Sequence, residues 1–252
     1  MSQPTEVSVP SSEQEARALF AAPSKPLVAG GATILTPELA SGARSADHVM
    51  LLHRAGLDGV RHDGSRITIG ATAPLSALRD MPEPLRGAVA GVADPEVRAQ
   101  ATLAGNICAA PLDSAPRGDL QGPLLALDAV VHWTDGLQDH RDGIEAFLAA
   151  DGAAARLVIG VEFDAPSDGA YAALRRPHSH GYTALAVSAA VVQGEIRLAA
   201  TGFAPHAVRL GPPGRPLPDG PARDDALASG WYRREMVPVL VRRCLEQMER
   251  PA

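Results

Sequence analysis

Apolar residues recur at helical spacing near both ends of the chain. The N-terminal helix is predicted over 11–22, because Ala16, Leu19 and Phe20 follow a serine pair that can cap the first turn. The same spacing predicts further helices at 74–79, 85–92 and 236–248. The last of these would hold Pro238 in its first turn, where proline is tolerated.

Short apolar or alternating runs between these helices predict strands, at 26–29, 66–70, 129–133, 157–163 and 195–200. Gln193 and Gly194 separate two apolar runs, which is typical of a two-residue hairpin turn. The proline-rich stretch 208–222 predicts a loop. Strands and helices therefore mix along the chain in the manner of an α+β protein.

Length and composition indicate a globular protein with more than one domain. The chain has 252 residues, of which 46% are hydrophobic and 21% charged, which is enough apolar material for a real core. The run Asp164 to Gly169 is rich in proline, aspartate and glycine, so we place a domain boundary there. The predicted domains are 1–166, with subdomains of about 1–60 and 61–166, and 167–252.

Charge and residue usage exclude several kinds of partner. A net charge of -6 and only 4% aromatic residues argue against nucleic acid. The chain shows neither a secretory signal pattern nor a membrane-spanning run, so we expect a cytoplasmic protein without a membrane partner. Cys108 and Cys244 lie far apart without metal-ligand companions, and His178 and His180 are interpreted as surface residues, so no metal site is predicted.

Two segments are nearly stripped of side chains, namely Ala29-Gly30-Gly31-Ala32-Thr33 and Thr102-Leu103-Ala104-Gly105-Asn106. Segments of this kind expose consecutive backbone N–H groups, which can hold the oxygens of a diphosphate without lysine or arginine. Neither matches the GxGxxG or GxxxxGK[ST] fingerprint, which argues against a Rossmann fold and a P-loop. An ordinary tight turn is the alternative interpretation of each segment taken alone.

The order of four segments changes that interpretation. Residues 27–35, 67–71, 101–107 and 118–129 together resemble the FAD-binding subunit or domain of the molybdenum hydroxylases, a family that includes carbon monoxide dehydrogenase and xanthine dehydrogenase. The resemblance runs from about Val7 to the end of the chain. It implies a two-lobed FAD-binding domain of the PCMH/vanillyl-alcohol-oxidase-like type, followed by a smaller α/β domain with a short antiparallel sheet.

The resemblance also implies roles for particular residues. Residues 29–33 and 102–106 correspond to the two diphosphate-binding loops, and Asp119 to the acid that bonds hydroxyl groups of the flavin nucleotide, with Asp113 as a rival. Tyr182 falls on a position near the flavin, with core packing as the alternative. No catalytic residue is predicted, because the chemistry belongs to the cofactor.

Several positions depart from the family pattern. Ala32 stands where a polar residue is usual, and Ala104 where a second glycine is usual, so both loops lose some of their means of binding. Ala173 replaces a common lysine, which would lower the flavin potential unless Arg175 or Arg176 supplies the cation.

The implied function is an FAD-binding electron-transfer subunit of a molybdenum-containing hydroxylase. A molybdopterin-binding large subunit and a [2Fe-2S] small subunit would be its partners, since two cysteines cannot hold those metals here. Two alternatives remain: a self-contained FAD-dependent oxidoreductase, and a non-catalytic assembly subunit that has lost FAD.

Overall fold

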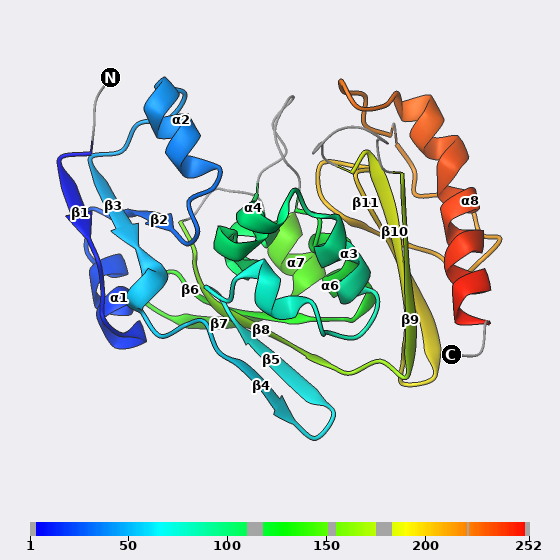
Figure 1. Ribbon diagram of the computed structural model, residues 1–252, viewed down its shortest axis with the longest axis horizontal. Coiled ribbons are helices and arrows are strands. Elements are labelled where there is room, and N and C mark those ends of the chain that lie inside the picture. Colours follow the sequence, from blue (N-terminus) through cyan, green and yellow to red (C-terminus); the bar gives the residue numbers. More distant parts are fainter. Residues whose placement is uncertain (1–3, 110–117, 151–154, 175–182, 221, 250–252) are drawn as a thin grey trace.

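The computed structural model describes residues 4–109, 118–150, 155–174, 183–220 and 222–249. Its strands form three sheets that follow one another along the chain (Figure 1). The first sheet and the C-terminal helix lie at opposite ends of the long axis, with a group of short helices between them. Within the described ranges, no helix has both the length and the apolarity needed to cross a bilayer.

The first sheet is small and parallel, with the strand order β1-β3-β2. Its strands are β1 (Glu6–Ser8), β2 (Leu27–Ala29) and β3 (His48–Leu51), and the helices between them are α1 (Glu13–Phe20) and α2 (Leu35–Ser41). Parallel neighbours need such crossover segments, because a tight turn can only reverse the chain. A single 3-10 turn, η1 (Leu52–Arg54), follows β3.

Helix α1 agrees with the prediction, although its cap is divided between two serines. Ser12 is the N-cap, and its hydroxyl accepts from the Glu15 N–H group at 3.2 Å. The Glu15 carboxylate accepts in turn from the N–H group of Ser11, not Ser12, at 2.7 Å. Ala16 and Phe20 are fully buried in the main core, so the apolar face of α1 faces the second sheet.

The second sheet is antiparallel and has the order β4-β5-β8-β6-β7. Its strands are β4 (Val60–Asp63), β5 (Arg66–Gly70), β6 (Val130–Thr134), β7 (Asp139–Gly143) and β8 (Leu157–Asp164). The long connection from β5 to β6 holds η2 (Leu75–Leu78), α3 (Leu85–Gly91), α4 (Pro95–Gln100), α5 (Leu103–Ile107) and α6 (Gln121–Ala126), while α7 (Ile144–Ala149) follows β7. Alternate residues such as Ile67, Ile69 and Val161 point into the core beneath these helices.

The third sheet is antiparallel, with the order β12-β11-β10-β9, and α8 (Gly230–Met248) covers one of its faces. Its strands are β9 (Asp168–Leu174), β10 (Leu185–Val192), β11 (Glu195–Thr201) and β12 (Val208–Leu210). Gln193 and Gly194 both have positive φ, at 54° and 81°, which confirms the predicted two-residue turn. The opposite face of the sheet packs on α3 and α6.

The mixed α/β architecture with antiparallel sheets therefore agrees with the predicted α+β class. The connection from β8 to β9 is 165–167, at the place of the predicted domain boundary. The main core nevertheless draws residues from all three sheets, including Met50, Val161 and Ala190. The chain is thus packed continuously across that connection.

Two sequence expectations about the C-terminal part were wrong. Helix α8 begins at Gly230, with Ser229 as its cap, so Pro238 lies in the helix interior and not in its first turn. The predicted loop 208–222 opens with strand β12, which pairs with β11 despite having only three residues.

Candidate cofactor-binding site

The first glycine segment lies directly against the start of the second one and the residues just before it. A Cβ atom added to Gly31 would lie 1.8 Å from the carbonyl oxygen of Gln100, and one added to Gly30 would lie 2.5 Å from Oγ1 of Thr102. Real Cβ atoms do not approach other atoms so closely, so only glycine allows this contact. The two segments, about 70 residues apart in the sequence, therefore meet at one place.

The first segment leads from β2 into α2 and leaves its backbone donors available. Within the described part of the chain, the N–H groups of Gly31, Ala32 and Thr33 have no hydrogen-bond partner. Ala32 has φ of 54°, in the left-handed region that residues other than glycine rarely adopt. Successive amides around a left-handed residue form a concave anion site, so this segment fits a diphosphate.

The second segment differs from the expectation, because its amides are already used. Thr102 is the N-cap of α5, and its hydroxyl accepts from the Gly105 N–H group at 3.2 Å. The N–H groups of Leu103 and Ala104 donate to the carbonyls of Ala73 and Ala71, each at 3.0 Å. The Asn106 N–H group donates to Thr102 within the turn, at 2.9 Å. The N–H groups of Leu103, Ala104, Gly105 and Asn106 therefore hold the segment in place and are not free donors for an anion.

All four segments that carry the family resemblance meet around α5. Ala71 and Ala73 follow β5 and accept from the second glycine segment, as described above. The side chain of Asn106 reaches the fourth segment, where its Oδ1 accepts from the Leu120 N–H group at 2.9 Å. Asp119, next in the chain to Leu120, is 7% exposed. Asp119 therefore lies next to the residue that contacts the second glycine segment.

Other residues discussed for this site lie outside the described residues. These are Asp113, Arg175, Arg176 and the predicted flavin contact Tyr182. Ala173 is described, on β9, where it pairs with Ala186 of β10.

A separate cleft of about 790 Å³ lies on the outer face of the second sheet and is lined by none of the predicted cofactor residues. His132 and Glu162 face it, with His132 Nε2 3.3 Å from Glu162 Oε2 in a geometry that does not make a hydrogen bond. Burial opposes ionisation of Glu162, but its hydrogen bond to Arg141 and the charges of His132, Arg141 and Arg66 hold the pKa of the carboxyl below its usual value.

Within the ranges that the structure describes, no group of three or more histidine, cysteine or acidic side chains could hold a metal ion.

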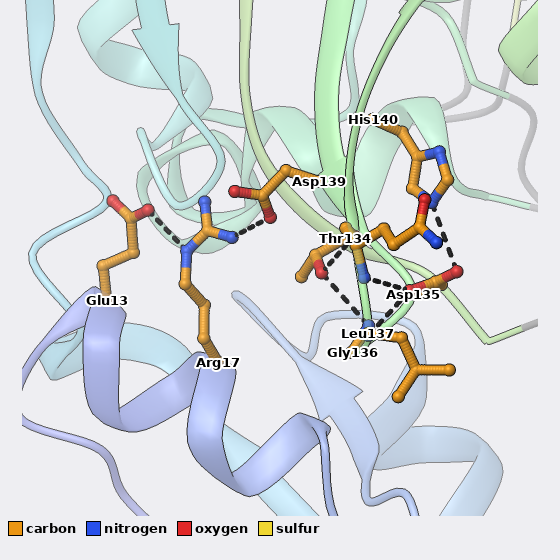
Figure 2. A network of polar contacts seen from close by, with 9 residues as sticks. Glu13, Arg17, Thr134, Asp135, Gly136, Leu137, Asp139 and His140 are labelled. Carbon is orange, nitrogen blue, oxygen red and sulfur yellow. Dashed lines mark hydrogen bonds and ion pairs between the residues drawn. The ribbon is translucent and has the colours of Figure 1, made fainter.

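A polar network ties α1 to the turn between β6 and β7 (Figure 2). Arg17 lies between the carboxylates of Glu13 and Asp139 and pairs with both. Asp135 closes the turn by accepting from the N–H groups of Leu137 and Gln138, at 2.7 and 2.8 Å. The pair between Arg17 and Asp139 therefore joins α1 to the second sheet.

Residues 3–163 match the family model described as the FAD binding domain in molybdopterin dehydrogenase. This chain belongs to that family. FAD is therefore its cofactor, as the sequence predicted, and the free amides of the first glycine segment provide a physical basis for binding its diphosphate. A search of curated proteins gave no match.

Solved structures show that the family fold extends over nearly the whole chain. The chain resembles a subunit of carbon monoxide dehydrogenase from Hydrogenophaga pseudoflava, in a form that lacks the Mo-pyranopterin moiety of the molybdenum cofactor, with a TM-score of 0.82, 19% identity and 98% of each chain covered. It also resembles quinoline 2-oxidoreductase from Pseudomonas putida 86, with a TM-score of 0.79, 17% identity, and coverage of 98% of this chain and 97% of the other. Reconstituted carbon monoxide dehydrogenase from Oligotropha carboxidovorans matches with a TM-score of 0.79, 18% identity and 98% of each chain covered. At these identities the likeness establishes the fold alone.

Sequence reasoning missed the residues that support the glycine segments of this family member. Gln100 contributes only a backbone carbonyl, and Ala71 and Ala73 contribute carbonyls from another segment. Side-chain type carries no signal for such contacts. Thr102 was singled out, but as part of a loop and not as the cap that fixes α5.

Proposed function

We propose that this chain is the FAD-binding electron-transfer subunit of a molybdenum-containing hydroxylase complex. A molybdopterin-binding large subunit would take electrons from the substrate that it hydroxylates, and the [2Fe-2S] clusters of a small subunit would pass them to this chain. An external acceptor would receive them. When bound, FAD would supply the capacity to take up electrons and release them again. The residues of this chain bind and orient that cofactor.

The proposal rests mainly on the contact of Gly30 and Gly31 with residues 100–102. This contact would make one site from two distant segments, with Ala29, Gly30, Gly31, Ala32 and Thr33 on one side. The donors on that side would be the N–H groups of Gly31, Ala32 and Thr33. Thr102, Ala104, Gly105 and Asn106 form the opposite wall, and we assign Asp119 to hydroxyl groups of the nucleotide, because a buried carboxylate can accept two such bonds. Tyr182 stays a predicted flavin contact.

The finer description of the fold belongs to the same proposal. We infer that the first and second sheets are the two lobes of an FAD-binding domain of the PCMH type, over 1–166, and that the third sheet and α8 form the second domain, over 167–252. The sheets support this division, since each is built from one continuous stretch of chain. A cytoplasmic location stays a prediction.

Partners are inferred from the family and from what the chain itself offers. The sequence has two cysteines, whereas a [2Fe-2S] cluster takes four protein ligands. The metal chemistry of such a complex would therefore reside in other chains.

Titration of the purified chain with FAD tests the binding function. We expect the flavin fluorescence to be quenched at one equivalent, and the complex to keep its flavin absorption bands through gel filtration. Protein that stays colourless after incubation with FAD would contradict this and favour the assembly subunit, a role with which the occupied amides of the second segment are also compatible.

Co-purification tests the electron-transfer role. We expect the full chain to co-purify with molybdopterin and [2Fe-2S] subunits when the three are expressed together. The substrate that the molybdopterin subunit hydroxylates should then reduce the flavin only when both partner subunits are present. A chain that reduces an acceptor with a substrate of its own would support the self-contained oxidoreductase instead.

A further inference from the structure

Gln121, the first residue of α6, joins two parts of the molecule through the polar atoms of its side chain. It is 2% exposed. Its Nε2 donates to the Ile107 carbonyl at 2.8 Å, and its Oε1 accepts from the Ala207 N–H group at 3.2 Å. Ile107 ends α5, which begins in the second glycine segment, and Ala207 directly precedes β12 of the third sheet. One buried amide therefore connects the cofactor site to the C-terminal part of the chain.

The residues on either side of Gln121 reinforce both connections. The Leu120 N–H group donates to Asn106 Oδ1, as described above, and the Gly122 N–H group donates to Oγ1 of Thr201 on β11 at 3.1 Å. A Cβ atom on Gly122 would lie 2.2 Å from that hydroxyl oxygen, so a larger residue would separate α6 from the third sheet. Three consecutive residues thus link α5 to the third sheet.

The chemistry of the amide makes Gln121 hard to replace. A glutamine side chain donates and accepts, an ionised glutamate only accepts, and a methionine of similar length does neither well. Loss of the donor would leave the Ile107 carbonyl unpaired in a buried place, and loss of the acceptor would do the same to the Ala207 N–H group. The structure around Gln121 would have to shift to satisfy them.

We propose that Gln121 is a positioning residue for the cofactor, which couples the docking of the third sheet to the placement of Asn106 and Asp119. This inference rests on the proposed function, since the coupling acts on FAD only if those residues bind it. Gln121 acts through the backbone of α5. Because coupling is reciprocal, FAD must in turn stabilise the docking of the third sheet.

The test compares FAD affinity with stability in the full chain. Gln121→Glu and Gln121→Met should each weaken FAD binding by about tenfold or more, measured by flavin fluorescence well below the unfolding midpoint. Gln138→Met is the matched control, because Gln138 is an exposed glutamine in the β6–β7 turn, and it should bind FAD like the wild type. Thr201→Val loosens the same interface from the side of the third sheet, because it removes the hydroxyl that accepts from the Gly122 N–H group. Since the coupling is reciprocal, this variant should lower the unfolding midpoint and also weaken FAD binding.

Each outcome decides the matter. Gln121 variants that lose thermal stability but bind FAD like the wild type would show a structural role only and overturn the proposal. A wild-type chain that binds no FAD overturns the proposed function itself, which the first titration reveals. If the variants do not fold, hydrogen exchange of the wild-type chain tests the coupling instead. FAD should slow exchange of the Ala207 N–H group, and an unchanged exchange rate there would refute the coupling.

Discussion

Replacing Gly31 by alanine tests whether the two glycine segments meet. The new methyl carbon would lie 1.8 Å from the Gln100 carbonyl oxygen, 2.6 Å from the carbonyl carbon and 3.0 Å from the Cα atom of Ala101. All three are backbone atoms of the facing segment, so no change of rotamer can relieve the collision. The segments must move apart, and the cofactor site must widen.

The size of the effect follows from the cost of overpacking. Forcing a methyl group into a filled space costs about 1–3 kcal/mol. In a chain of this length each kcal/mol lowers the unfolding midpoint by about 2–4 °C. If the first segment moves away to relieve the strain, it must return to its original place when FAD binds. The strain is then subtracted from the binding free energy, and about 1–3 kcal/mol corresponds to about 5- to 150-fold weaker binding.

The measurement is the thermal midpoint together with the dissociation constant for FAD. Gly59→Ala is the matched control, because a Cβ atom there meets nothing within 4 Å, and it should change stability by no more than about 0.5 kcal/mol. If Gly31→Ala matches the control in both quantities, the two segments are not in contact and the reasoning about the site fails.

Two further predictions concern the backbone of the first segment and the turn in Figure 2. Ala32→Gly should raise the free energy of unfolding by up to about 1 kcal/mol, because the relief of left-handed backbone strain exceeds the entropy that glycine adds to the unfolded chain. Urea unfolding measures this change, and a loss of stability would contradict it. Hydrogen bonds from the N–H groups of Gln138 and Leu137, and then from His140, lower the pKa of Asp135 from 3.8 to about 2. A depressed folded pKa means that Asp135 contributes stability above about pH 4, which is lost as the pH falls towards 2. Asp135→Asn removes this contribution, so its urea midpoint should fall less on acidification than that of the wild type, and parallel pH profiles would refute the assignment.

Hydrophobic periodicity predicted the strands and helices that carry apolar faces. Strand β5 coincides with the alternating run 66–70, and α1 lies inside the predicted helix 11–22. Strand β7 has the sequence Asp-His-Arg-Asp-Gly and no apolar residue, so nothing in its pattern predicts a strand. Strand β7 forms because a tight turn brings it beside the unpaired backbone N–H and C=O groups of β6. Its position in the sheet therefore depends on β6 and not on the residues of β7.

The sequence predicted the glycines of the site but not the residues that contact them. The segments around Gly31 and Gly105 were recognisable because missing side chains are visible in a sequence. Which carbonyl oxygen lies beside each amide is decided by chain segments tens of residues away, as for Ala104 and the carbonyl of Ala71. The free and the occupied amides could therefore be told apart only in three dimensions.

Because the first segment has free amides and the second has occupied ones, the two segments have different roles. Gly30 and Gly31 are required by the chain itself, since side chains there would strike residues 100–102, whereas the donors that remain for a diphosphate are the amides of residues 31–33. The second segment is instead bonded to 71–73 on one side and, through Asn106, to 118–122 on the other. Cofactor affinity should therefore respond to changes in 118–122 as strongly as to changes in the glycines. The reason is that residues 118–122 hold the second segment, which must move when they move.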